Sequence, residues 1–226
     1  MAFDALPERL ARVRAEIADR QARSGGRQSV MVMAVTKGHG PEAVHAAVAA
    51  GLTMVGENRV QEALRKQDEV GDVKVEWHLI GSLQRNKARH VVGRFAMVHS
   101  VDSPELASEL DRRVTDGPQS VLLQVNCSGE PQKGGVEPGS LATLLDATDR
   151  SERLAVRGLM TMAAFDADEA EQRRTFALLR ELRDRHARPG RMLEELSMGM
   201  SDDYGVAVEE GATIIRLGSA LLGARA

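Results

Sequence analysis

The stretch VMAVTKGHG, residues 32–40, is apolar for four residues, reaches Lys37 and then breaks into glycines. A run that is apolar on both faces is typical of a strand covered on both sides, as in parallel sheets flanked by helices. A lone lysine after such a strand is usually a solvated charge. Its alternative role is that of an amine at the edge of a buried site, and the rest of the chain bears on that choice.

Short β-rich runs alternate with helical stretches along the whole chain, after a first helix at about 5–23. We expect strands at 29–36, 53–56, 75–80, 95–100, 120–126, 154–160, 193–197 and 213–217. Strand then helix, repeated eight times, predicts an α/β fold, a (β/α)₈ TIM barrel. No linker divides residues 1–226, so we expect a single barrel domain, with residues 1–25 as an N-terminal helix packing on it. An open doubly wound sheet is the competing architecture.

The composition is that of an ordinary globular protein, and it favours a small molecule over nucleic acid as the binding partner. The chain has 226 residues, 42% hydrophobic content, a net charge of -3 and few aromatic residues (four Phe, one Tyr, one Trp), which does not favour nucleic-acid binding. The first residues carry charges at helical spacing, unlike a signal peptide, and no run is apolar enough to span a membrane. The single cysteine, Cys127, cannot form an intramolecular disulfide. We expect a cytoplasmic protein, and the histidines show no metal-ligand grouping.

Two glycine-serine loops follow the last two predicted strands, where barrels commonly bind phosphate. They read SMGMSDD (197–203) and RLGSALLG (216–223). Their glycines let backbone N–H groups approach an anion, while Ser201 and Ser219 add hydroxyl donors. Alternatively, these serines simply cap helices.

Arg216 and Lys37 add to this picture through closure of the barrel. Arg216 lies inside the apolar run 213–217, so its guanidinium forms either a structural ion pair or a ligand contact. Closure pairs the last strand with the first, which brings Lys37 beside both loops. A lysine among apolar residues and near another cation has its ammonium form disfavoured, and the neutral amine can attack an aldehyde. Together these groups suggest pyridoxal 5'-phosphate (PLP) held as a Schiff base on Lys37.

Several motifs in this order resemble the pyridoxal phosphate homeostasis proteins, over nearly the whole chain. They are AVTKG (34–38), VGENRVQEA (55–63), WHLIGSLQRNKAR (77–89), RGLMTM (157–162), LSMGMSDD (196–203) and IIRLGSALLGAR (214–225). The resemblance implies a barrel like the N-terminal domain of alanine racemase that binds PLP without a well-established catalytic reaction. One departure is local: many relatives read SKTKP where this chain has TKGHG.

The resemblance also implies roles for individual residues. Lys37 is the implied Schiff-base lysine, and Arg216 is implied to face the pyridine nitrogen. The phosphate is implied to bind the hydroxyls of Ser201 and Ser219 and the backbone at Met200 and Gly218.

Two further residues complete the predicted set of cofactor-binding residues. Asn58 either caps the helix that follows it or, as the resemblance implies, lies near the cofactor. His78 either points into the barrel under the cofactor or is a hydrogen-bonded core histidine.

The favoured function is a PLP-binding homeostasis protein that holds, buffers and delivers the cofactor, with PLP-dependent apoenzymes as candidate recipients. A PLP-dependent amino-acid racemase is the alternative, although the sequence shows no second acid/base residue. A third possibility is a barrel enzyme that binds a sugar phosphate at the same loops. We expect a monomer, because the racemase dimer depends on a domain that this chain lacks.

Overall fold

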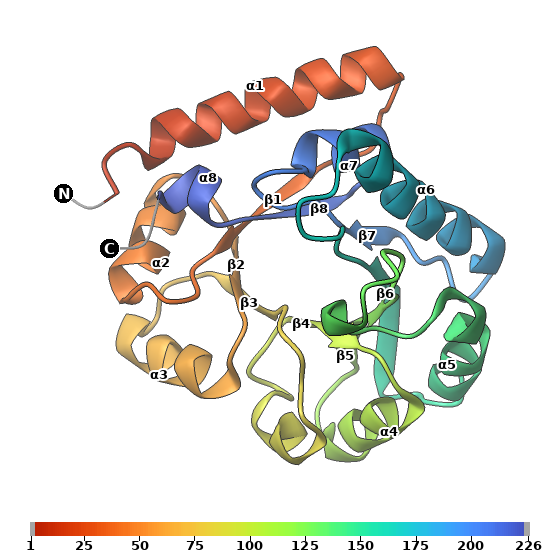
Figure 1. Ribbon diagram of the computed structural model, residues 1–226. Coiled ribbons are helices and arrows are strands. Elements are labelled where there is room, and N and C mark those ends of the chain that lie inside the picture. The colour runs from red at the N-terminus through yellow and green to blue at the C-terminus, as the bar shows by residue number, and fades with distance from the viewer. Residues whose placement is uncertain (1–2, 224–226) are drawn as a thin grey trace.

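The structure, a computed structural model, describes residues 3–223, and its eight parallel strands close into one barrel (Figure 1). The strands are β1 Met31–Val35, β2 Met54–Glu57, β3 Glu76–Leu79, β4 Met97–Val101, β5 Gln119–Gln124, β6 Leu154–Met160, β7 Glu195–Ser197 and β8 Ile214–Leu217. Each lies within or beside a predicted run. The predicted TIM barrel is confirmed, and the open doubly wound sheet is excluded because β1 pairs with β8.

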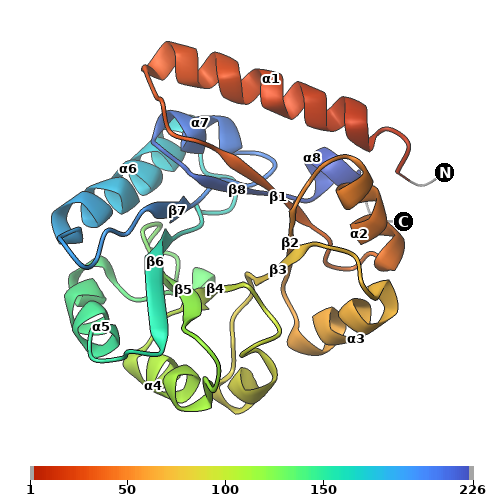
Figure 2. The same cartoon turned by 180° about the vertical axis from the view of Figure 1, so that it is seen from behind.

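A ring of helices surrounds the strands, as the view from behind also shows (Figure 2). The helices are α1 Leu6–Ser24, α2 Pro41–Ala49, α3 Val60–Val70, α4 Pro104–Arg113, α5 Leu141–Thr148, α6 Glu169–His186, α7 Tyr204–Glu209 and α8 Ser219–Leu222. The predicted alternation is wrong at one place, because the β3–β4 connection carries only a 3₁₀ helix, Arg85–His90. Ala88 is the one buried residue of that segment, so it has no apolar stripe that would hold a longer α-helix against the barrel.

The two faces of β1 enter different parts of the core. Met33 packs with Met54 and Ile214 in a small cluster, whereas Ala34 belongs to the large cluster shared with the surrounding helices. Side chains alternate along a strand, so the face of Met33 points into the barrel. The same alternation carries the interior face on through Val35 to Lys37, at the carboxyl end of the strand.

The pairing of β8 with β1 forms the seam of the barrel and determines which residues meet at its mouth. Met31 lies opposite Ile214 and Met33 opposite Arg216 in this parallel ladder. The loops that leave the two strands at their carboxyl ends therefore lie beside one another. Lys37 belongs to the first of these loops, and Ser219 begins α8 directly after the second.

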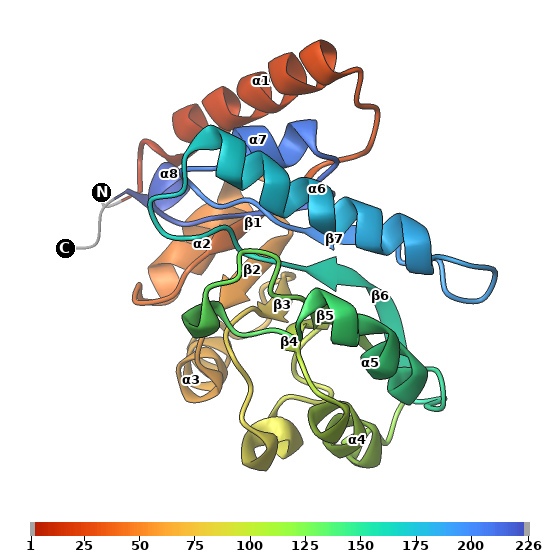
Figure 3. The ribbon, with the colours of Figure 1, turned by 45° about the vertical axis from the view of Figure 1, so that its right-hand side comes forward.

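Helix α1 lies across the outside of this seam, against α7 and α8 (Figure 3). Its buried residues, Leu6, Leu10, Val13 and Ile17, recur every three or four positions and so form one apolar stripe. The helix ends where Gly25 adopts a left-handed conformation at φ 73°. The residues that follow lead directly into β1.

Candidate functional site

A cavity of about 460 Å³ opens at the carboxyl end of the barrel and contains most of the predicted site. Seven of the eight predicted residues line it: Lys37, Asn58, Met200, Ser201, Arg216, Gly218 and Ser219. They come from the ends of β1, β2, β7 and β8, or from the loops that follow them. Strands distant in sequence thus bring an amine, a guanidinium, an amide and two hydroxyls to one cavity.

Arg216 reaches the cavity from inside the barrel, where its side chain is buried. Its Nη1 donates to Ser197 Oγ at 2.8 Å, and its Nη2 donates to the carbonyl oxygen of Thr161 at 2.9 Å. Burial lowers the pKa of Arg216 to about 10, and the nearby Asp203 carboxylate opposes that shift. The guanidinium is therefore a cation held by neutral acceptors, with further N–H groups left for a ligand.

Gly199 and Gly218, one from each predicted phosphate loop, differ in their roles. Gly199 has φ 92°, and a Cβ there would lie 2.6 Å from the Cβ of Ala207, so this position needs glycine for the turn into α7. Gly218 lines the cavity, and a Cβ there would make only ordinary contact with Val35 at 3.7 Å or more. The missing side chain at Gly218 thus leaves space in the cavity rather than relieving a clash.

The serines also have distinct surroundings. Ser219 is exposed and is the first residue of α8. Ser201 lies in the turn before α7, and its Oγ accepts a hydrogen bond from the backbone N–H of Ala220 at 3.2 Å. This contact joins the β7 loop to α8. Ser201 is therefore partly a capping residue, as its alternative interpretation suggested, while it also lines the cavity.

Asn58 follows β2 and presents a polar atom that the protein does not satisfy. Its Oδ1 is buried and has no hydrogen-bond partner within residues 3–223. Buried polar atoms are rarely left unpaired, since each costs about 1–3 kcal/mol. An orphaned amide oxygen on the wall of a cavity fits a site built for a polar ligand.

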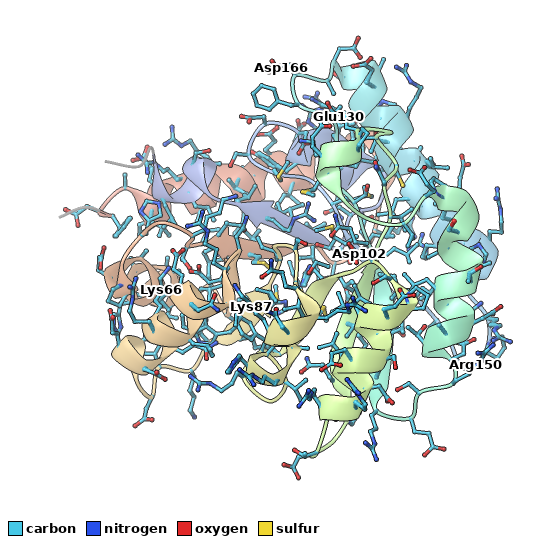
Figure 4. All side chains as sticks on the ribbon, turned by 60° about the horizontal axis from the view of Figure 1, so that its bottom comes forward. Lys66, Lys87, Asp102, Glu130, Arg150 and Asp166 are labelled. Carbon is cyan, nitrogen blue, oxygen red and sulfur yellow. The ribbon has the colours of Figure 1, made fainter. Side chains whose placement is uncertain are left out.

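Side chains of α3 hydrogen-bond to the backbone on both sides of Lys37. Lys66, on α3 (Figure 4), donates from Nζ to the carbonyl oxygen of Thr36 at 2.8 Å and to Glu57 Oε1 at 2.5 Å. The N–H of Gly38 donates to Glu62 Oε1 at 2.7 Å. The segment that carries Lys37 is thus anchored at the residue before it and at the residue after it.

His78 is the predicted site residue that does not line the cavity. It is buried on β3, and its Nδ1 lies 2.9 Å from Nε2 of His99 on β4. Burial lowers the pKa of His78 to about 4, so the ring is neutral at neutral pH. This placement corresponds to the hydrogen-bonded core histidine that was the alternative interpretation.

Sequence reasoning missed the apolar walls of the cavity, which include Ile80, Met162 and Phe165. Phe165 is 78% exposed at the rim, and its backbone N–H donates to Glu130 Oε2 at 3.1 Å. Glu130 follows β5 and Asp166 follows β6, and Figure 4 shows both on neighbouring loops at the top of the molecule. A single exposed aromatic residue gives no sequence signal, since only the fold brings it to this rim.

Cys127 is half-buried, and burial raises the pKa of its thiol to about 12. At pH 8 a thiol with that pKa is ionised in only about one molecule in ten thousand. We therefore expect iodoacetamide to alkylate Cys127 in the folded chain at least about a hundredfold more slowly than free cysteine. Mass spectrometry of timed samples measures this rate. Equal rates would contradict the shielding, and the urea-unfolded chain is the positive control.

Two further properties concern the described part of the chain as a whole. Across residues 3–223, no group of three or more His, Cys, Asp or Glu side chains is placed to hold a metal ion. Over the same residues, no helix is both long enough and apolar enough to cross a membrane.

Comparison with known proteins gives the family. The model of the family described as alanine racemase, N-terminal domain, matches residues 9–226. A pyridoxal phosphate homeostasis protein of Aquifex aeolicus is 41% identical over 96% of this chain and 97% of its own length. The chain belongs to the pyridoxal phosphate homeostasis protein family. A second member, from Pseudomonas aeruginosa, is 44% identical over 97% of this chain and 96% of its own length.

Two solved structures resemble this member of the pyridoxal phosphate homeostasis protein family. PipY of Synechococcus elongatus, in a structure with PLP bound, has a TM-score of 0.79 and 42% identity, covering 92% of this chain and 100% of its own. Alanine racemase of Corynebacterium glutamicum has a TM-score of 0.73 at 16% identity, covering 96% of this chain and 60% of its own. The second likeness shows the fold alone. The predicted resemblance to this family and to the racemase barrel is confirmed.

Proposed function

We propose that this chain is a PLP-binding protein of PLP homeostasis, which holds, buffers and delivers the cofactor. The observation that carries the proposal is that one cavity joins Lys37, Arg216 and the two serine loops at the barrel mouth. The PLP-bound structure of the PipY relative supports the choice of ligand.

The residues of the cavity match the parts of PLP in kind. Ser201 and Ser219 supply hydroxyl donors, and Met200 and Gly218 line the same cavity, as a phosphate site needs. The amide of Asn58 brings an unpaired polar atom. The amine of Lys37 would hold the cofactor covalently. PLP supplies an aldehyde that condenses reversibly with primary amines.

The presence of Arg216 in the cavity supports a carrier of the cofactor rather than a PLP-dependent catalyst. An arginine side chain can only donate hydrogen bonds and does not give up its proton in a protein. If it faces the pyridine nitrogen, that nitrogen stays unprotonated, and the cofactor is a poor electron sink. A weak electron sink on a reversible tether suits a carrier better than a transaminase.

The racemase alternative needs a second acid/base group, and Tyr204 does not fit that role. Tyr204 does not line the cavity, and its hydroxyl donates to Glu16 Oε2 of α1 at 2.5 Å. Burial and the Glu16 carboxylate raise the pKa of Tyr204 above its usual value. The phenol therefore joins α1 to α7 on the outside of the barrel.

Equilibrium dialysis of the purified protein against PLP and against pyridoxal tests the proposal. We expect one PLP per chain, and at least tenfold weaker binding of pyridoxal because it lacks the phosphate. Borohydride reduction followed by peptide mass spectrometry should place the label on Lys37. The loaded protein should then restore activity to a PLP-dependent apoenzyme.

Three results would count against this proposal. Binding of pyridoxal as tight as that of PLP would contradict a phosphate site at the serine loops. A label on another lysine would contradict Lys37 as the residue that holds PLP covalently. If free PLP reactivates an apoenzyme and the loaded protein does not, the protein binds PLP but does not deliver it. Ser219 is exposed, so Ser219→Ala should fold like wild type, and we expect it to weaken the binding of PLP but not that of pyridoxal.

A further inference from the structure

A line of buried polar side chains runs from Arg216 into the barrel, and the proposed function uses only its first member. Arg216 Nη1 is 2.8 Å from Ser197 Oγ, and Ser197 Oγ is 2.9 Å from His99 Nδ1. His99 Nε2 is in turn 2.9 Å from His78 Nδ1. The four side chains come from β8, β7, β4 and β3, so they cross the interior from one wall to the other.

The direction of every hydrogen bond in this line follows from its first member. Arg216 can only donate, so Ser197 Oγ accepts from it. Within residues 3–223, the only other polar contact of Ser197 Oγ is His99 Nδ1, so the hydroxyl proton points there. His99 consequently carries its proton on Nε2 and donates it to His78 Nδ1.

The last member of the line has a donor without an acceptor. His78 must carry its proton on Nε2, which is buried and has no hydrogen-bond partner within the described residues. The carboxylate of Glu76 lies 3.6 Å from it, too far for a hydrogen bond, and the Glu76 side chain is 63% exposed. Glu76 is the first residue of β3, so the line ends toward the face of the barrel opposite the cavity.

Both histidines are neutral in this arrangement. Burial lowers the pKa of His99 well below its usual value, and the neighbouring His78 and Arg216 lower it further. A protonated His99 would place a second donor against Ser197 Oγ, and the serine proton would then have no acceptor. Geometry and desolvation therefore favour the same protonation state.

These hydrogen bonds determine the orientation of the Arg216 guanidinium at the cavity. Two neutral acceptors, Ser197 Oγ and the Thr161 carbonyl, hold the guanidinium plane. The carbonyl is part of the backbone and is fixed, whereas a serine hydroxyl rotates freely unless its proton is engaged. His99 is the group that engages it and so keeps a lone pair of Ser197 directed at Arg216.

We propose that His99 is a positioning residue for Arg216, acting through Ser197, with His78 fixing the tautomer of His99. The proposal rests on the proposed function, because Arg216 is the group that would face the cofactor ring. It also gives His78 a role without contact to the cofactor.

Two substitutions of His99 separate positioning from simple packing. Asparagine places an acceptor where Nδ1 lies, whereas glutamine retains a donor near Nε2 and loses that acceptor. We expect the PLP dissociation constant of His99→Gln to rise at least tenfold and that of His99→Asn to stay within threefold of wild type. Ser197→Ala should resemble His99→Gln, because it removes the acceptor of Arg216.

A double-mutant cycle shows whether the effect passes through Arg216. In an Arg216→Met background, His99→Gln is expected to change the PLP dissociation constant by less than twofold, because the positioned group is gone. A histidine that acted only by packing would weaken binding equally in both backgrounds. The thermal midpoint of each variant reports its folding separately.

Nitrogen NMR of the wild-type chain without PLP provides a readout that does not depend on cofactor binding. We expect His99 and His78 both to be protonated on Nε2 and bare on Nδ1 at pH 7. A proton on Nδ1 of His99 would overturn the proposal, as would equal PLP affinities of His99→Gln and wild type. Absence of PLP binding by the wild-type protein would instead overturn the proposed function, whatever the tautomers.

Discussion

The Lys37→Ala variant is expected to show no borohydride-trapped PLP and to bind the cofactor at least about a hundredfold more weakly, a loss of about 2.7 kcal/mol. Removal of the amine leaves only the hydrogen bonds and charges of the remaining cavity. Phosphate, ring and arginine contacts should still retain some PLP by non-covalent binding. Dialysis and mass spectrometry measure the two effects separately.

Two matched variants control this measurement. Lys37→Arg keeps a positive charge but lacks a nucleophilic amine, so it should also fail to trap PLP. Lys87→Ala removes a lysine outside the cavity, whose Nζ contacts Gln61, and should trap PLP like wild type. Trapping by Lys37→Ala at the wild-type level would mean that another lysine is the tether.

The Lys66→Met variant is expected to lose about 3–5 kcal/mol of unfolding free energy at pH 7. The Lys66 side chain is 4% exposed and that of Glu57 is fully buried, so the substitution leaves a carboxylate without its cation. It also removes the donor to the Thr36 carbonyl beside Lys37. Urea unfolding measures the loss, and PLP binding should weaken because the Lys37 segment loses an anchor.

The pH dependence of this loss has a definite sign. Burial raises the pKa of Glu57, and the Lys66 hydrogen bond is the largest effect that opposes the rise. Without Lys66 the pKa rises further, so the folded variant binds a proton more readily than the unfolded chain. Its stability relative to wild type should therefore fall as the pH rises through that pKa, and the deficit should be smaller at pH 5 than at pH 7.

Arg65 on the same helix provides the control for Lys66. The Arg65 side chain is 75% exposed, so Arg65→Met should change the unfolding free energy by no more than about 0.5 kcal/mol. Adding Glu57→Gln to Lys66→Met should recover part of the loss, because the buried charge is removed. A loss for Lys66→Met as small as that for Arg65→Met would show that the buried pair is not an anchor.

The eight strands could be predicted because each combines a short β-rich run with a helical stretch or turn after it. Their ends were less predictable. The run 29–36 contains β1, which is confined to Met31–Val35, because ladder bonds with two neighbours decide where a strand ends. The strand-helix alternation predicted an α-helix between β3 and β4, but the segment Arg85–His90 lacks an apolar stripe and forms only a 3₁₀ helix.

The site was predictable as far as it depends on strand ends and barrel closure. Closure alone placed Lys37 beside Arg216 and Ser219, because the first and last strands must pair. The contact of His78 with His99 depends on the placement of β3 and β4 and on rotamers, which one sequence does not reveal. In the sequence Lys66 is one more charge on an amphipathic helix, since its burial depends on a carboxylate from β2, that of Glu57.

The seam between β1 and β8 has a consequence for the order of events during synthesis. Lys37 is synthesised before Arg216 and Ser219, so a nascent chain that still lacks β8 offers only half of the cavity. A ligand that needs both halves of the cavity can be captured only after β1 and β8 have paired. Under the proposed function, bound PLP would bridge β1 and β8, and its binding free energy would oppose local opening of that ladder.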